Sequence, residues 1–302
     1  MNNLGFGMMR LPLLSDDPTD FDYDQLDQMV DAFLNAGCTY FDTSFVYHNG
    51  HSEHAVRKAL VERHPRESFT IATKFPTFQN VPEDKVEETF QTQLDNLGVD
   101  YIDYYLLHNI QTVLYDGING KGGIIEAVKG GGLSKLPAEA EALLKAIRPD
   151  DSISSWSLRF SLQMEDVIAV LSGMSTMQQM EDNIATAKSS EPLSAEEIDA
   201  LWQAMRLYRD SAPITPAQLK AFEGILWNEV PATAILQAYS ICQIQPDPGF
   251  SDDNNYLKNA LAERAHLDLF GDLPKQKVTL PDGTDATDQV EKAIQWLKEN
   301  SF

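Results

Sequence analysis

FDTSFVYHNGHSE, at residues 41–53, decides the fold of this chain, because it joins the end of an apolar, strand-like run to the start of a helix. Two later runs, ATKF at 72–75 and LLHN at 106–109, also pass from apolar into polar residues where a strand would end. Helix-like stretches separate the three runs, such as residues 24–36, where apolar side chains recur at helical spacing. Strands that alternate with helices predict βα units and a parallel sheet.

Four polar residues lie at or just past the ends of these runs, namely Asp42, Tyr47, Lys74 and His108. The carboxyl ends of successive parallel strands meet at one rim of a barrel, so we expect the four side chains to share a site. Taken singly, each has an ordinary explanation: a turn or helix cap, a packing residue, a solvated charge and a structural histidine. All four in this order are harder to explain by chance.

This set of side chains suits the reduction of a carbonyl group. A tyrosine is a weak acid, with an unperturbed pKa of about 10, and a nearby ammonium group stabilises its phenolate. A carboxylate beside the lysine would hold the ammonium in place, and a neutral histidine could donate a hydrogen bond to the carbonyl oxygen. No side chain supplies a hydride, so enzymes of this kind take it from a nicotinamide.

The composition limits the partners and the compartment. The formal charge of −23 and the pI near 4.5 predict a solvated acidic surface, which nucleic acid and anionic membranes repel. The two cysteines, Cys38 and Cys242, form no disulfide framework and cannot by themselves fill a four-thiolate zinc or iron–sulfur site. No apolar run is long enough to span a membrane, and the N-terminus lacks a signal-peptide pattern, so we expect a cytoplasmic protein.

Two further patterns predict no site. The histidines at 48, 51 and 54 are three residues apart, but they straddle a loop and a helix start within a motif that already has a role, so we expect no metal there. The GKGG stretch at 120–123 lacks the serine or threonine and the preceding strand of a P-loop, so we expect no phosphate site there.

The chain resembles the aldo/keto reductase family in the three runs quoted above and in LGFGMMRLP at 4–12. Two later segments, IIEAVKGGGL at 124–133 and VLSGMSTMQQMEDN at 170–183, resemble the seventh and eighth strands of that family with their cofactor loops. The resemblance implies an α/β protein of the (β/α)8 TIM-barrel type that uses NADP or NAD to reduce aldehydes or ketones. It also implies that Tyr47 is the general acid, that Lys74 tunes it, that Asp42 supports Lys74 and that His108 orients the carbonyl.

The cofactor residues that the resemblance implies lie in three loops. They are Gly7 and Met8 after the first strand, Gly130 and Gly131 after the seventh, and Gly173, Ser175, Asp182 and Asn183 after the eighth. Many NADP-preferring relatives have an arginine for the 2′-phosphate where this chain has Gln179. Glutamine lacks the cationic fork that grips a phosphate, so the preference between NADP and NAD stays open.

The chain departs from the family after His108. Ile124, which opens a predicted strand at 124–128, follows His108 by only 16 positions, whereas a βαβ unit needs roughly 30 residues. The fifth and sixth βα units of the barrel are therefore expected to be missing near residues 123–124. Three explanations stand open: the units are absent from the gene, they are absent only from the sequence as written, or a second copy of the chain supplies them by self-association.

We expect a shortened barrel at residues 1–205 and a helical extension at 206–302. The extension resembles that of a subset of these reductases, many of which carry a ferredoxin-like cysteine cluster there. This chain has only Cys242 in that region, so we expect no iron–sulfur cluster. The predicted function is that of an NAD(P)H-dependent oxidoreductase acting on a small carbonyl substrate. The alternative is a catalytically impaired nucleotide-binding or scaffold protein of the same descent.

Overall fold

The structure, a computed structural model, describes most of the chain outside residues 109–135 and 245–256. The described ranges are 3–79, 81–108, 136–164, 167–189, 191–211, 213–244 and 276–300, with scattered positions from 257 to 274. The predicted strand at 124–128, the GKGG stretch, and the predicted cofactor residues Gly130 and Gly131 lie outside the described residues. The chain forms two compact units, Met1–Ser134 with Asp150–Glu197, and Lys135–Pro149 with Ile198–Phe302. Compactness alone does not define a domain, so the division at 205–206 stays a prediction.

The first unit is built on a parallel sheet, as the alternation of strands and helices predicts. Its five described strands lie in the order β4-β3-β2-β1-β5, and every neighbouring pair is parallel. Their bounds are β1 Leu4–Gly7, β2 Tyr40–Asp42, β3 Thr70–Phe75, β4 Tyr104–Leu107 and β5 Val170–Gly173. The segment 170–183, which resembles an eighth strand with its loop, thus opens with β5. It pairs with β1, which is the neighbour that an eighth strand has in a closed barrel.

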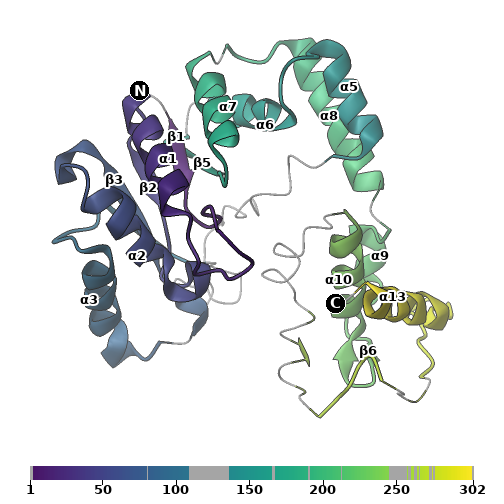
Figure 1. Cartoon of the computed structure of the whole chain (residues 1–302). Helices are drawn as coiled ribbons and strands as arrows, with labels where there is room; N and C mark the ends of the chain where they lie inside the picture. Colours follow the sequence, from purple (N-terminus) through teal and green to yellow (C-terminus); the bar gives the residue numbers. More distant parts are fainter. Residues whose placement is uncertain are drawn as a thin grey trace. The chain divides into compact units, whose positions relative to one another are not determined.

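Most helices of this unit follow a strand and lie alongside the sheet, whereas the one that precedes β5 packs on the helix that follows β5 (Figure 1). They are α1 Tyr23–Asn35, α2 Ser52–Val56, α3 Val86–Leu97, α6 Ile153–Leu162 and α7 Met177–Lys188. The ends of these helices follow from the sequence. Asp22 caps α1 by accepting a hydrogen bond from the amide of Gln25, and Gly98 ends α3 in a left-handed conformation that favours glycine.

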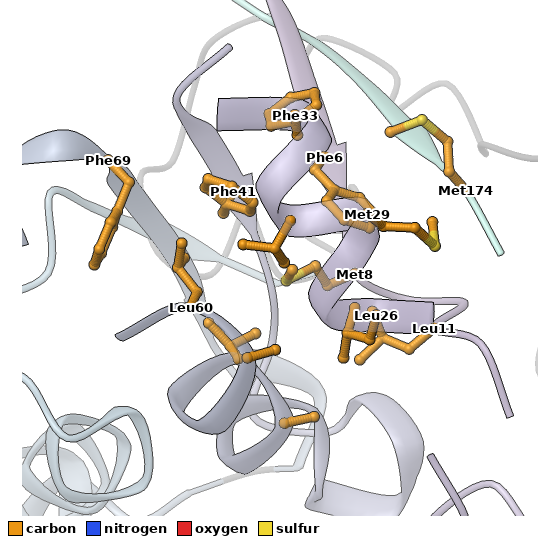
Figure 2. Packing of buried hydrophobic residues seen from close by; sticks show 14 of the residues in the cluster. Phe6, Met8, Leu11, Leu26, Met29, Phe33, Phe41, Leu60, Phe69 and Met174 are labelled. Carbon is orange, nitrogen blue, oxygen red and sulfur yellow. The ribbon is translucent and has the colours of Figure 1, made fainter. Parts of the chain in front are cut away.

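The hydrophobic core of this unit lies between the sheet and its helices. Phe6 of β1, Phe41 of β2 and Phe33 of α1 pack with ring centroids 5.2–6.0 Å apart, and Figure 2 shows them with Met29 and Leu60 in one cluster. Burying side chains of this size contributes roughly 1.5–3 kcal/mol each. The cluster fixes the register of β1 and β2, since a slip by one residue would turn these rings to the other face of the sheet.

The strands at the two edges of the described sheet are exposed. All four side chains of β4 are exposed, from Tyr104 to Leu107, and so is Leu171 of β5. A closed barrel would bury such side chains in its interior or beneath its helices. Within the described residues, these two edge strands lack the cover that a closed barrel provides.

The second unit is mainly helical, as expected for the C-terminal part of the chain. Its helices are α5 Ala138–Ile147, α8 Ala195–Asp210, whose first three residues belong to the first unit, α9 Pro216–Lys220, α10 Ala232–Ile244 and α13 Thr287–Glu299. A short hairpin, β6 Leu226–Trp227 with β7 Val230–Pro231, was not expected from the sequence. Pro281-Asp282-Gly283 forms a turn, since Thr279 and Asp285 form an antiparallel bridge around it. No helix in the described ranges has the length and apolar character needed to cross a bilayer.

Candidate active site

The register of the sheet brings the predicted catalytic residues to one face. Gly7 pairs with Asp42 and with Gly173, Asp42 pairs with Ala72, and Lys74 pairs with Leu106. Side chains alternate between the two faces of a strand, so Lys74, two residues beyond Ala72, lies on the face of Asp42. The opposite face carries Phe6 and Phe41. We call the face that holds Asp42 and Lys74 the catalytic face.

Lys74 and Asp42 form an ion pair on the catalytic face. Lys74 Nζ lies 2.5 Å from Asp42 Oδ1 and donates a second hydrogen bond, of 2.6 Å, to the carbonyl oxygen of Thr43. Both side chains are largely buried, with exposed fractions of 11% and 4%. Burial raises the pKa of the Asp42 carboxyl, and the charge of Lys74 opposes that rise. The structure thus brings Asp42 and Lys74 together as the sequence predicts.

Tyr47 lies between Lys74 and His108. Lys74 Nζ is 4.7 Å from the centroid of the Tyr47 ring, and the ring of His108 meets that of Tyr47 edge to face at 5.5 Å. The two residues after Tyr47, His48 and Asn49, both have left-handed backbone angles, with φ of 52° and 53°. This sharp bend separates Tyr47 from the helix that follows, which begins at Ser52.

His108 is held in a neutral form. Its Nδ1 is 2.8 Å from Ser44 Oγ, and its backbone carbonyl accepts a hydrogen bond from Thr77. Burial, together with the nearby charge of Lys74, lowers the pKa of His108 from 6.5 to about 4. If the Ser44 hydroxyl donates to Nδ1, the ring proton is on Nε2, where it can be donated to a substrate oxygen.

The predicted cofactor residues that the structure describes lie at the carboxyl ends of β1 and β5 and in α7. Gly7 and Gly173 face each other in register. Met8 is fully buried in the core, and its backbone amide donates to the carbonyl of Asp42. Asp182 Oδ2 accepts a hydrogen bond from Ser152, whereas the buried Asn183 donates one to Ser172. That these residues contact a cofactor stays a prediction.

The loop after β5 ties back to the loop after β1. Ser175 donates from its hydroxyl to the carbonyl of Arg10, and its amide donates to Gln179 Oε1. Gln179, the residue that stands where many relatives have an arginine, is therefore engaged in closing its own loop. These contacts bring Arg10, which the sequence did not single out, to the predicted cofactor loop.

Sequence reasoning missed three further residues around the catalytic four. Thr43 and Ser44, which follow Asp42 directly, supply the acceptor for Lys74 and the partner for His108. Glu53 is fully buried and accepts hydrogen bonds from Thr73 and Gln93. Thr73 directly precedes Lys74, and Gln93 donates a hydrogen bond to the carbonyl oxygen of Lys74. All three residues lie in the stretch 41–53, in DTS before Tyr47 and HSE after it. The spacing does not indicate which of the two hydroxyls faces the histidine.

The three histidines of the same motif lie in separate surroundings. His48 accepts a hydrogen bond at Nε2 from the amide of Leu11, so its proton is on Nδ1, which lies 2.8 Å from the carbonyl of Pro18. The rings of His51 and His54 are 6.3 Å apart. Within the described ranges, no three His, Cys, Asp or Glu side chains converge as metal ligands would.

Comparison with known proteins gives matches to aldo/keto reductases. Residues 3–148 match the model of the aldo/keto reductase family. Aldo-keto reductase str7 of Strobilurus tenacellus is 31% identical over 179 residues, which make up 55% of this chain and 52% of that protein. Probable aldo-keto reductase 1 of Glycine max is 33% identical over 171 residues, or 52% of this chain and 49% of that protein. The matches thus span about half the length of these curated relatives.

Solved structures show the same fold. A thermostable aldo-keto reductase, Tm1743, crystallised with the inhibitor epalrestat, aligns with 67% of this chain and 94% of its own, at a TM-score of 0.51 and 19% identity. An aldo-keto reductase from Klebsiella pneumoniae in complex with NADPH aligns with 67% of this chain and 90% of its own, at a TM-score of 0.50 and 15% identity. At these identities the likeness concerns the fold alone. The part of this chain that matches the aldo/keto reductase family model, residues 3–148, carries all four predicted catalytic side chains.

Proposed function

We propose that this protein is an NAD(P)H-dependent reductase that converts a small aldehyde or ketone to the alcohol, with Tyr47 as the proton donor. The observation that carries the proposal is the position of Lys74, which pairs with Asp42 at 2.5 Å and lies 4.7 Å from the centre of the Tyr47 ring. An ammonium group at that place stabilises the phenolate that Tyr47 becomes when it gives up its proton.

The side chains divide the work as follows. His108, neutral at pH 7, donates a hydrogen bond to the carbonyl oxygen and orients it toward the Tyr47 hydroxyl. The Tyr47 hydroxyl gives its proton to that oxygen as the oxygen gains negative charge, and water later restores the proton to the phenolate. Lys74 stabilises the phenolate meanwhile, and Asp42 keeps Lys74 charged and in place.

The hydride for the carbonyl carbon comes from a nicotinamide cofactor when one is bound. The carboxyl ends of β1 and β5 suit such a group, because Gly7 and Gly173 lie opposite each other there without side chains. A relative from Klebsiella pneumoniae was crystallised with NADPH, which supports a dinucleotide for this chain too. We propose that Gly7, Gly173, Ser175, Asp182 and Asn183 contribute to holding it, together with Gly130 and Gly131.

A second candidate is a nucleotide-binding or scaffold protein that retains the catalytic side chains. The exposed apolar residues of β4 and β5 favour it, because the barrel interior that would orient a substrate is uncovered at these strands. A nucleotide-binding protein of this kind would bind a dinucleotide without turning over a carbonyl substrate, and a scaffold protein would do neither.

One experiment separates the two candidates. The full chain is titrated with NADPH and NADH, with cofactor fluorescence as the readout, and is then assayed for cofactor oxidation across a panel of aldehydes and ketones. Saturable binding with turnover of at least one carbonyl supports the reductase. Binding without turnover on the whole panel supports a nucleotide-binding protein, whereas no binding of either cofactor contradicts the reductase and leaves only a scaffold role.

A further inference from the structure

Arg10 holds its guanidinium group over Gly173. A Cβ atom built on Gly173 would lie 2.8 Å from Arg10 Nη2 and 3.4 Å from Cζ and Nε. Alanine at 173 would therefore displace the guanidinium group. The backbone fixes this approach as well, because Ser175 Oγ donates a hydrogen bond to the carbonyl oxygen of Arg10. Contacts with Gly173 and Ser175 thus hold Arg10 in place where the loops after β1 and β5 meet.

The guanidinium group of Arg10 has no acceptor in the described part of the chain. Its side chain is half-buried, yet it forms no ion pair and no hydrogen bond with any residue that the structure describes. This is unexpected in a chain with 46 acidic residues and only 23 lysines and arginines. On the same rim, Lys74 is paired with Asp42. Arg10 therefore presents five donors with a full positive charge, and no anionic side chain among the described residues receives them.

We propose that Arg10 binds a phosphate group of the dinucleotide at the carboxyl ends of β1 and β5. The inference rests on the proposed function for the identity of the ligand. Arginine binds phosphate through two parallel hydrogen bonds from its planar fork, and it suits such a site better than lysine does. The guanidinium group occupies the space where a side chain at position 173 would lie, so the position of Arg10 depends on the glycine at 173. Gln179, which stands where many NADP-preferring relatives have an arginine, cannot supply this charge.

A dinucleotide can offer Arg10 either its pyrophosphate or a 2′-phosphate. The affinities for NADPH and NADH show which of these two groups Arg10 binds. NADPH and NADH share the pyrophosphate, but only NADPH has the 2′-phosphate. We compare their dissociation constants for the wild-type chain, for Arg10→Met, which keeps the bulk of the side chain, and for Arg10→Lys, which keeps the charge without the fork. Arg206→Met, at an exposed position on α8, is the matched control for the loss of one positive charge.

Losing a charge-assisted hydrogen bond weakens binding about tenfold or more. If Arg10 contacts the pyrophosphate, Arg10→Met weakens NADPH and NADH alike. If it contacts the 2′-phosphate, only NADPH is weakened, and the ratio of the two constants changes. In both cases Arg10→Lys recovers part of the affinity and Arg206→Met binds like wild type. Dissociation constants for both cofactors that stay within twofold of wild type in Arg10→Met would overturn the proposal.

Inorganic pyrophosphate separates this proposal from the proposed function. It is added to each chain, and the thermal unfolding midpoint is measured. If the wild-type chain binds neither dinucleotide but pyrophosphate raises its midpoint and leaves that of Arg10→Met unchanged, the anion site stands and the proposed function fails. If the wild-type chain responds to neither dinucleotide nor pyrophosphate, the Arg10 proposal fails as well.

Discussion

Lys74 Nζ lies 2.5 Å from Asp42 Oδ1, and both side chains are largely buried beside the Tyr47 ring. The pair is expected to be a strong determinant of stability, since removal of one partner leaves the other charge buried without compensation. Asp42→Asn and Lys74→Met should each lower the free energy of unfolding by about 3–5 kcal/mol. The double variant should be less destabilised than the sum of the two, because it leaves no unpaired charge.

Urea denaturation of the two single variants and the double variant measures this coupling. Asp84→Asn and Lys85→Met, at exposed positions, are the matched controls and should change the free energy of unfolding by less than about 0.5 kcal/mol. Strict additivity of the two buried substitutions would contradict the account of the pair.

His108 should titrate near pH 4 in the folded protein, well below its usual value of 6.5, because of its burial and the charge of Lys74. Between these two values the unfolded chain binds the proton and the folded chain does not. The free energy of unfolding should therefore fall as the pH drops from about 6.5 toward 4. Asp42, with its raised pKa, acts in the opposite sense above pH 3.8. The difference between wild type and His108→Gln isolates the histidine.

The chemical shift of the His108 ring, followed by NMR against pH, gives the titration directly. Lys74→Met should raise the pKa of His108, since it removes a repelling positive charge, and Lys85→Met should leave it unchanged. A wild-type midpoint close to 6.5 would mean that His108 is neither buried nor close to Lys74 in solution.

The residues of the catalytic face could be predicted from the sequence. Asp42, Lys74 and His108 end strand-like runs, and strands of a parallel sheet meet at their carboxyl ends, so their convergence followed from pattern alone. The Ser44–His108 contact did not follow, because which of two adjacent hydroxyls faces a histidine depends on backbone angles that no pattern encodes. Arg10 was also missed, since the space above Gly173 exists only when β1 and β5 lie side by side.

Glu53 should support the catalytic face from beneath. Its carboxylate accepts hydrogen bonds from Thr73, Gln93 and Asn96, and Gln93 also donates to the carbonyl of Lys74. Glu53→Ala leaves these buried donors without an acceptor and should lower the free energy of unfolding by about 1–3 kcal/mol, or more.

Thermal and urea unfolding of Glu53→Ala test this network, with the exposed Glu88→Ala as the control for helix composition and charge. Glu53→Gln, which keeps one acceptor oxygen, should fall between wild type and the alanine variant. Equal stability of Glu53→Ala and Glu88→Ala would show that the buried carboxylate has no structural role.

Phe41 should be among the most sensitive positions of the core. Its ring packs against Phe6 and Phe33 with almost no exposure, and Figure 2 shows it at the centre of the cluster. Phe41→Ala should lower the free energy of unfolding by about 3–5 kcal/mol. Leu14→Ala, at a position that is 69% exposed, should change it by less than about 0.5 kcal/mol. Comparable losses in the two variants would contradict the assignment of the core.

The central claim is that Tyr47 gives its proton to a carbonyl oxygen during reduction. The most direct test is the rate of cofactor oxidation by Tyr47→Phe, which removes one hydroxyl and keeps the ring, measured beside wild type on a carbonyl that the wild-type chain reduces. Tyr101→Phe, at an exposed tyrosine, is the matched control. The account predicts that Tyr47→Phe binds the cofactor as wild type does but loses about 10²–10⁴-fold in kcat, whereas Tyr101→Phe keeps full activity. Full turnover by Tyr47→Phe would contradict it.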